Sequence, residues 1–231
     1  MTDTIVHILL LIALPPLMPG VINKIKAWFA GRNGPPVLQL YYDLFKLMRK
    51  GMVISDTTTW VFFAGPIVTL AAVLLAGMLI PIGGFEAPIA FAGDLILFAY
   101  LFGLARFFTT AAALDTGSPF EGMGAAREVT FACLSEPALF FAFLVLAKVS
   151  GSFTLTRMLH NSAGVIASGM AAPLVLISIG LFVVLLAENC RVPFDDPTTH
   201  LELTMIHEVM VLDHSGPALA AILHSAGLTV L

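Results

Sequence analysis

Ionisable side chains are concentrated directly behind a long apolar segment near the C-terminal end of the sequence. Residues 158–187 contain no Asp, Glu, Lys or Arg, and the next stretch then carries Glu188, Arg191, Asp195, Asp196, Glu202 and Glu208. Because charge is costly at membrane depth, ionisable residues crowded against the end of a span are a hypothesis for function. Carboxylates held close together cannot all ionise at once, which indicates a proton or ion relay. The alternative is an acidic patch that docks a basic partner surface, and the two roles are compatible.

Two more charges lie within apolar stretches upstream. Arg106 lies about a dozen residues into the stretch 94–114, where an unpaired guanidinium would cost several kcal/mol, so it must find a carboxylate or backbone carbonyls. Glu136 follows Arg127 by nine residues, about 13 Å along a helix axis. We predict that Glu136 is a titratable relay residue, with a structural ion pair to Arg106 as the alternative.

The histidines and cysteines do not form a recognisable metal motif. His200, His207 and His214 recur every seven residues, about 10.5 Å along a helix, which is too far apart for one ion. We interpret them as groups that tune or relay protons near neutral pH. Cys133 and Cys190 alone cannot hold an iron–sulfur cluster, which usually takes four cysteines. We therefore assign this chain no catalytic residue, no metal ligand and no bound cofactor, and we interpret both cysteines as ordinary membrane cysteines.

The composition is that of an integral membrane protein. The chain has 231 residues, of which 58% are hydrophobic and 11% are charged, whereas about a quarter of a soluble domain is charged. The net charge of −4 argues against nucleic acid as a partner and leaves the lipid bilayer as the expected surroundings.

Five stretches have the length of a membrane span, about 20 residues each. We expect spans at about 4–22, 60–82, 94–114, 128–149 and 167–187, and a partial sixth helix after 214. The first of these is interrupted by prolines 15, 16 and 19. The predicted fold is all-α: a polytopic transmembrane helix bundle that forms a single membrane domain over residues 1–231.

The distribution of basic residues predicts the orientation. Six cations lie between the first two spans, namely Lys24, Lys26, Arg32, Lys46, Arg49 and Lys50. By the positive-inside rule, loops 23–59, 115–127 and 188–213 are cytoplasmic and the N-terminus is outside, in a multi-pass protein of the cell (inner) membrane.

The first cytoplasmic loop also contains a helical pattern. Apolar residues recur at helical spacing at Val37, Leu40, Tyr41, Leu44, Leu47 and Met48. This pattern predicts a cytoplasmic interfacial amphipathic helix within about 35–50. A loop helix packed on a partner protein is an equally weighted alternative. In the third loop, Pro193 and Pro197 predict irregular backbone, after which a helix resumes over 201–212.

Several of these motifs resemble a known family. They are Asp115-Thr-Gly-Ser-Pro-Phe, Gly124-Ala-Ala-Arg-Glu, Glu136-Pro, Pro193-Phe-Asp, Leu201-Glu-Leu and Asp213-His-Ser-Gly. Together with Gly31-Arg-Asn-Gly-Pro-Pro, they resemble the membrane subunit of group 4 membrane-bound NiFe hydrogenases. Those are the formate hydrogenlyase and hydrogenase-4 type complexes, whose membrane subunit is homologous to the one that forms much of the quinone chamber in respiratory complex I. The likeness covers essentially the whole chain and places Arg127, Glu136, Glu188, Arg191, Asp195 and Glu202 on the family's charged positions, with Asp213 where a Glu is usual.

The resemblance implies a coupling subunit without a redox centre of its own. Such a subunit would anchor cytoplasmic Fe–S and NiFe hydrogenase subunits, which hold the metal centres, and would pass the effect of electron transfer to antiporter-like membrane subunits that move H⁺ or Na⁺. We expect Glu188 and Glu202 at the contact with that cytoplasmic arm, or one layer behind it. The candidate ion-coupling residues are therefore Arg106, Asp115, Arg127, Glu136, Glu188, Arg191, Asp195, Asp196, Glu202, Glu208 and Asp213.

Two other functions fit parts of the pattern. Within the same class, the alternative is a quinone-binding membrane subunit of a complex-I-like NADH:quinone oxidoreductase. From a different class comes a stand-alone secondary transporter that uses Arg106 and Glu136. The absence of a visible inverted repeat argues against the transporter.

Overall fold

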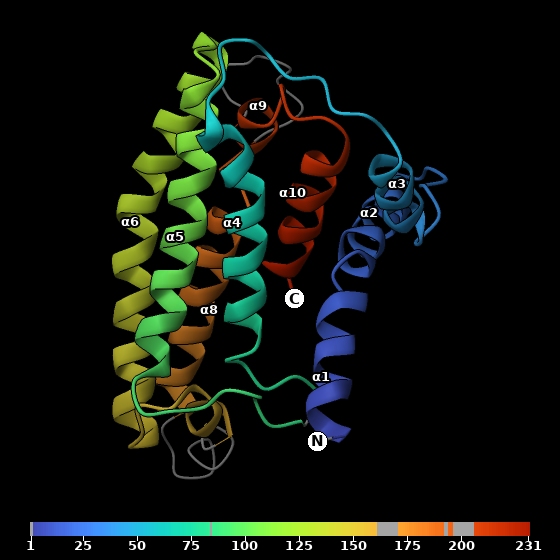
Figure 1. Ribbon diagram of the computed structural model, residues 1–231. Helices are drawn as coiled ribbons and strands as arrows, with labels where there is room; N and C mark the ends of the chain where they lie inside the picture. The colour runs from blue at the N-terminus through green and yellow to red at the C-terminus, as the bar shows by residue number, and fades with distance from the viewer. Residues whose placement is uncertain (1, 84, 161–170, 192–193, 196–205) are drawn as a thin grey trace.

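The predicted all-α architecture is confirmed by the computed structural model of the protein (Figure 1). The structure describes residues 2–83, 85–160, 171–191, 194–195 and 206–231. Within these ranges the only strand-like pairing is an isolated bridge between Ile82 and Phe85. The helices described there are α1 (Thr2–Ala13), α2 (Leu17–Phe29), α3 (Gln39–Met48), α4 (Trp60–Gly77), α5 (Asp94–Asp115), α6 (Pro119–Ser150), α8 (Ala171–Glu188), α9 (His207–Met210) and α10 (Gly216–Leu228).

The first apolar stretch is a bent pair of helices. α1 and α2 meet at an angle of 46°, and Pro15 and Pro16 lie in the break, as the prolines predicted. Tyr41 of α3 donates a hydrogen bond to the carbonyl of Ala13, which has lost its helical partner at the end of α1. The interruption is thus stabilised by a neighbouring element, and α2 continues to Phe29 rather than ending near residue 22.

The beginning of α6 differs from the sequence prediction. The helix starts at Pro119, so most of the expected loop 115–127 is helical, and α6 is 32 residues long. Ser118 is extended and Pro119 occupies the first helical turn, a common way to start a helix. At the other end, Gly151 stops the helix with a left-handed φ of 68°. This shift places Glu128 well inside a helix instead of at its edge.

Among the described residues, length and apolar composition qualify three helices as membrane spans: α4, α5 and α6. The bent pair α1–α2 makes a fourth if it is counted as one span. α8 and α10 are apolar but shorter than a full span over the described residues. The expected fifth span begins at residue 167, outside the described residues, and the partial helix after 214 is present as α10. The expected second span ends earlier than predicted, at Gly77 instead of residue 82.

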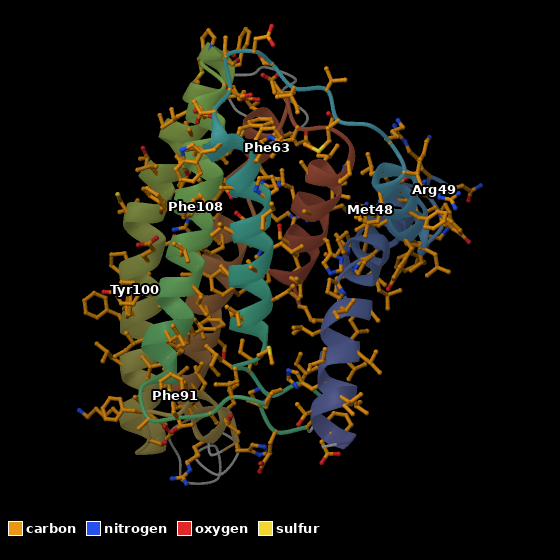
Figure 2. All side chains as sticks on the ribbon, viewed as in Figure 1. Met48, Arg49, Phe63, Phe91, Tyr100 and Phe108 are labelled. Atoms are coloured by element: carbon orange, nitrogen blue, oxygen red, sulfur yellow. The ribbon has the colours of Figure 1, made fainter. Side chains whose placement is uncertain are left out.

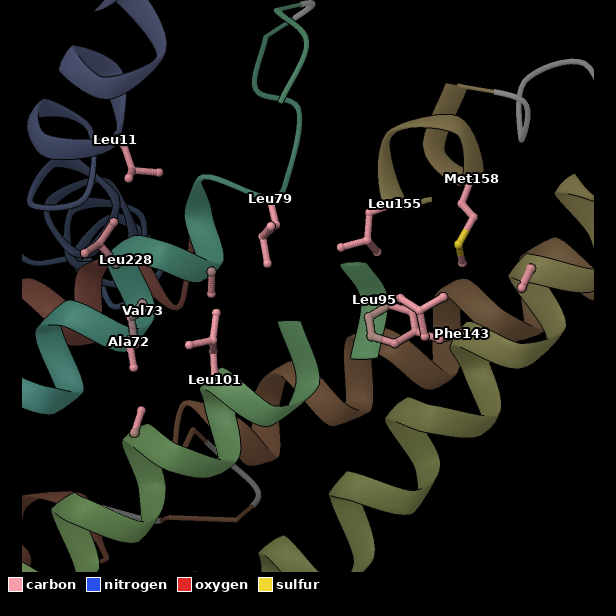
Figure 3. Packing of buried hydrophobic residues seen from close by; sticks show 13 residues of the cluster. Leu11, Ala72, Val73, Leu79, Leu95, Leu101, Phe143, Leu155, Met158 and Leu228 are labelled. Atoms are coloured by element: carbon pink, nitrogen blue, oxygen red, sulfur yellow. The ribbon is translucent and has the colours of Figure 1, made fainter. Parts of the chain in front are cut away.

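α4 and α5 pack closely through small and hydroxyl-bearing residues. A Cβ at Gly65 would lie 2.6 Å from Ala112 Cβ and 3.2 Å from Phe108 O, so the two helices approach where no larger residue fits. One turn on, Thr69 Oγ1 donates to Ala105 O at 3.1 Å. The main apolar core adjoins this contact and joins α1, α4, α5, α6 and α10. Figure 3 shows Leu11, Val73, Leu101, Phe143 and Leu228 within it.

The connections predicted to share one side of the membrane lie at one end of the bundle. In Figure 1 the α3–α4 connection, the α5–α6 turn and α9 are at the top, whereas the N-terminus and the α4–α5 connection are at the bottom. The predicted helix within 35–50 is α3, which packs against α2 and α10. Its predicted apolar stripe is half-buried from Val37 to Leu47, whereas Met48, the last residue of the stripe, is exposed. The inner stripe therefore faces this chain instead of lipid. The helix predicted over 201–212 is seen from His207 to Met210, because 201–205 lie outside the described residues.

Candidate functional site

Arg106 of α5 contacts three carboxylates from two neighbouring helices. Its Nε lies 3.2 Å from Glu128 Oε1 and its Nη1 lies 2.7 Å from Glu136 Oε1, both on α6. Its Nη2 contacts Glu188 Oε2 at the end of α8. Each guanidinium nitrogen thus faces a different carboxylate, which uses the planar fork of arginine fully. We call these four residues the Arg106 cluster.

The spacing on α6 explains why two of its acids face the same guanidinium. Glu128, Ala132, Ser135 and Glu136 follow the i, i+4, i+7, i+8 pattern of one helix face. Ala132 is buried between the acids and its small side chain leaves room for α5 and α8 to approach. The helix continues through Pro137.

The members of the cluster differ in burial. The side chains of Arg106, Glu128 and Glu188 are 10%, 11% and 15% exposed, whereas that of Glu136 is 46% exposed. Glu136 therefore reaches the outer surface of this chain while it remains paired with Arg106. The structural ion pair considered for Glu136 is present, and its role as a relay residue remains a prediction.

Two uncharged groups hold the free oxygens of the buried acids. Ser135 Oγ donates to Glu188 Oε1 at 2.8 Å, and Cys190 Sγ donates to Glu128 Oε2 at 3.2 Å. Burial and the negative charge of Glu128 raise the pKa of the Cys190 thiol, so it stays protonated and keeps its donor hydrogen. Both oxygens of Glu128 and of Glu188 therefore have partners, which is what carboxylates in an apolar bundle require.

A polar cavity of about 210 Å³ connects the cluster to the loops at the upper end of the bundle. Arg106, Glu128 and Glu188 line one part of it. The other part is lined by four residues that the sequence predicted as ion-coupling or proton-tuning groups: Arg191, Asp195, His207 and Glu208. Burial and the nearby Arg191 lower the pKa of His207. The volume is enough for several water molecules, so the cavity can bridge these groups by hydrogen bonds.

A second, mainly apolar cavity of about 470 Å³ adjoins the first. It lies among α1, α4, α5, α6, α8 and the end of α10, and Phe98, Phe102 and Phe143 contribute aromatic walls. Glu188 lines both cavities. The carboxylate of Glu188 thus lies at the boundary between a cavity lined by charged residues and one lined mainly by apolar residues.

Asp115 has a different place from the cluster. Its Oδ2 accepts hydrogen bonds from the backbone N–H groups of Thr59 at 2.7 Å and Phe62 at 3.2 Å, and its Oδ1 accepts from Thr59 Oγ1 at 2.8 Å. Asp115 therefore caps the N-terminus of α4 from the end of α5, where a negative charge also favours the helix dipole.

The remaining predicted residues are spread over the upper end of the bundle. The backbone N–H of Asp213 donates to Glu121 Oε1 at 3.0 Å, and Glu121 is fully buried. Arg127 is half-buried on α6 and has interactions of its own. Asp195 is buried and its Oδ2 accepts from the N–H of Ile206 at 3.1 Å. Asp196 and Glu202 lie outside the described residues.

Glu128 and Cys190 belong to the site but were not among the predicted residues. A prediction from the length of the apolar stretch alone places Glu128 at the first residue of a span. Such a prediction ignores the helix start that Ser118 and Pro119 indicate. A signal was available, since Glu128 and Glu136 lie eight residues apart on one helix face. Among the described residues, no group of three or more His, Cys, Asp or Glu side chains could hold a metal ion.

Comparison with known proteins gives consistent matches. The family model for NADH dehydrogenase matches residues 2–230. Hydrogenase-4 component C of Escherichia coli (strain K12) is 36% identical over 213 residues, which are 91% of this chain and 65% of that protein. Formate hydrogenlyase subunit 4 of the same organism is 38% identical over 154 residues, or 67% of this chain and 50% of that protein. The chain thus spans between half and two thirds of the length of these curated relatives.

More distant relatives extend the comparison. NADH-ubiquinone oxidoreductase chain 1 of Mycosarcoma maydis is 30% identical over 219 residues, which cover 92% of this chain and 63% of that protein. Among solved structures, a chain of the membrane-bound sulfane sulfur reductase, an archaeal respiratory membrane complex, matches 99% of this chain and 74% of its own length. The TM-score is 0.81 at 24% sequence identity, so this likeness is one of fold.

Proposed function

The chain belongs to the NADH dehydrogenase family, and on this premise we propose that it is the membrane anchor and coupling subunit of an energy-converting NiFe hydrogenase complex. The family membership and the apolar helices make it a membrane subunit of the kind found in respiratory complexes. The two hydrogenase-type relatives are 36% and 38% identical, compared with 30% for the NADH-ubiquinone oxidoreductase chain, which favours the hydrogenase branch.

The observation that carries the proposal is the Arg106 cluster. One guanidinium faces three carboxylates, so full ionisation would leave two uncompensated negative charges among apolar helices. Such a cluster is suited to hold a proton that is shared among its acids. The proton can be gained or lost without a large movement, because each acid already has a hydrogen-bond partner.

The polar cavity supplies the connection to the loops. It extends from Arg106 to His207 and Glu208, which lie at the end of the bundle where the cytoplasmic arm is expected. At an effective dielectric constant of about 20, a redox charge about 10 Å away changes the protonation free energy of an acid by about 1.7 kcal/mol. This corresponds to a change of more than one unit in its pKa. Electron transfer in a neighbouring Fe–S subunit can therefore change the protonation of this network.

Glu136 connects the Arg106 cluster to neighbouring membrane subunits. It is paired with Arg106 yet nearly half exposed at the outer face of α6, a position that a neighbouring membrane subunit can contact. In this mechanism, a change in charge at the loop side alters the protonation of Glu128 or Glu188. Glu136 then passes the effect to antiporter-like subunits that translocate H⁺ or Na⁺.

Purification of the intact complex tests the proposal. A tagged version of this chain should co-purify with Fe–S and NiFe hydrogenase subunits, and vesicles that contain it should translocate ions while forming H₂. Glu136→Gln keeps the side-chain volume and removes the titratable proton, so assembly should persist while translocation falls. A chain that purifies alone and transports ions by itself would contradict the proposal and favour a secondary transporter.

A quinone-binding subunit of a complex-I-like oxidoreductase is the second candidate. The apolar cavity of about 470 Å³ beside Glu188 favours it, since it could receive a hydrophobic ring and tail. The two candidates differ in the electron acceptor. Reduction of added quinone by the purified complex, together with absence of H₂ formation, would select this alternative.

A further inference from the structure

The corner formed by α2 and α3 combines exposed apolar side chains with positive charge. Its apolar members are Trp28, Phe29, Leu38, Tyr42, Phe45 and Met48, which are all exposed. Segment 24–50 contains six cations and one acid, a net charge of +5 in a chain whose total is −4. The side chain of Arg49 points away from the bundle (Figure 2). We call this surface the basic corner.

α3 has a second apolar stripe that its packing within the chain does not use. The inner stripe, from Val37 to Leu47, faces α2 and α10. Leu38, Tyr42 and Phe45 recur at helical spacing on a different face, and Tyr42 and Phe45 are 63% and 61% exposed. A helix that is apolar on two sides lies between two apolar surroundings. One is this chain, and the outer one must be lipid or another protein.

The aromatic residues favour lipid as the outer surroundings. The chain has two tryptophans, Trp28 at the end of α2 and Trp60 at the start of α4, and they are 75% and 72% exposed. Trp28 lies in the segment 23–59 that the sequence predicts to be cytoplasmic, and Trp60 directly follows this segment. Exposed tryptophans mark the level of the lipid headgroups. The guanidinium of Arg49 lies 4.4 Å from the ring centre of Phe45, which aligns its charged end along an apolar surface.

The positive charge of the basic corner indicates which class of lipid headgroup it binds. Of the six cations, Lys26 lines the polar cavity, while Lys24, Arg32, Lys46, Arg49 and Lys50 are exposed at the corner. The lone acid, Asp43, accepts a hydrogen bond from Gln39 Nε2 at 3.0 Å. Positive charge next to interfacial aromatics is complementary to anionic phospholipids. We propose that the basic corner binds the headgroups of anionic phospholipids in the adjoining leaflet.

Electron paramagnetic resonance with spin-labelled lipids tests this inference on the purified complex in bilayers. The measured quantity is the preference of protein-bound lipid for phosphatidylglycerol over phosphatidylcholine. Lys46→Gln/Arg49→Gln should lower it, by up to about fivefold for each cation removed, and salt should weaken the wild-type preference. The matched control is Lys148→Gln/Arg157→Gln, which removes one exposed Lys and one exposed Arg at the opposite end of the bundle. This control variant should leave the measured lipid preference unchanged.

Two results would overturn the proposal. One is an equal effect of the two double variants on the lipid preference, because this would mean that the corner contributes nothing specific. The other is a photo-cross-linker at position 42 that captures a protein subunit of the complex in place of phospholipid, because the outer stripe would then be a protein interface. Neither result depends on whether the complex forms H₂ or moves ions.

Discussion

The thiol of Cys190 donates a hydrogen bond to Glu128, across 3.2 Å, from a backbone position that normally suits glycine. Cys190 has a φ of 45°, in the left-handed region, directly after the end of α8. Its N–H donates to Ala187 O, as expected of a residue that closes a helix end. A non-glycine residue there costs about 1 kcal/mol, so the side chain has a role that compensates for the backbone strain. We infer that this role is to hold Glu128 towards Arg106.

Three substitutions of Cys190 distinguish the effect of its thiol from the effect of its backbone conformation. Cys190→Ser should keep coupling, because a hydroxyl also donates to Glu128. Cys190→Ala and Cys190→Gly should both reduce ion translocation for each H₂ formed, since both remove the donor. Glycine also relieves the left-handed backbone, so Cys190→Gly should be more stable than Cys190→Ala by about 1 kcal/mol. Thermal unfolding and vesicle translocation measure the two effects, and equal coupling in all three variants would contradict the role of the thiol.

Asp115 should matter for stability instead of coupling. Asp115→Ala removes three acceptor contacts from the start of α4 and should destabilise the protein by about 1–2 kcal/mol. Translocation for each H₂ formed should be unchanged in the assembled complex. Thermal unfolding and the ion-to-H₂ ratio are the measurements. A normal unfolding temperature with a lost ion signal would instead support the relay role predicted from the sequence.

Part of this site follows from the sequence and part does not. Arg106 and Glu136 could be singled out because each is a charge within an apolar stretch, and such charges must face a partner. The capping contacts of Asp115 could not be predicted, because a carboxylate that caps a helix and one in a relay look alike until α4 is placed beside α5. Glu128 was missed for a related reason, since its depth depends on where α6 begins.

The fold, like the site, could be predicted from the sequence only in part. The lengths of the apolar stretches predict the bounds of α4 and α5 to within a few residues, because hydrophobicity determines where these two helices begin and end. The packing of α3 could not be predicted, because two apolar stripes on one helix do not say which of them faces the protein. Tyr41 resolves this, since its hydroxyl reaches Ala13 at the break between α1 and α2.

The close approach of α4 and α5 predicts a strong effect of one methyl group. Gly65→Ala places a Cβ 2.6 Å from Ala112 Cβ, so the helices must separate, and we expect a loss of about 1–3 kcal/mol of stability. Gly65→Ala/Ala112→Gly moves the methyl group to the other helix and should recover much of this loss. Thermal unfolding in detergent measures both variants. A double variant no more stable than Gly65→Ala would show that the contact at Ala112 is not the cause.

Acid should destabilise the protein through His207. Burial and Arg191 lower its pKa in the folded protein, so His207 is neutral there while the unfolded chain binds a proton near its ordinary pKa of about 6.5. Stability is therefore unaffected by this group above that pH and falls as the pH drops below it towards the folded pKa. His207→Gln should flatten the decline of the unfolding temperature between about pH 7 and 5. His160→Gln, at an exposed position, is the control, and equal profiles for both variants would contradict the prediction.

The ratio of ions translocated to H₂ formed in vesicles carrying Glu188→Gln tests the central claim most directly. Glu188 contacts Arg106 and lines both cavities, so its neutralisation should disturb the shared proton most. Glu86→Gln, at an exposed position in the connection between α4 and α5, is the matched control. We predict that Glu188→Gln assembles and keeps its hydrogenase activity with an artificial electron donor, while its ion-to-H₂ ratio falls at least about tenfold, equivalent to about 1.4 kcal/mol, and well below that of the control. An unchanged ratio in the assembled Glu188→Gln complex would contradict the account.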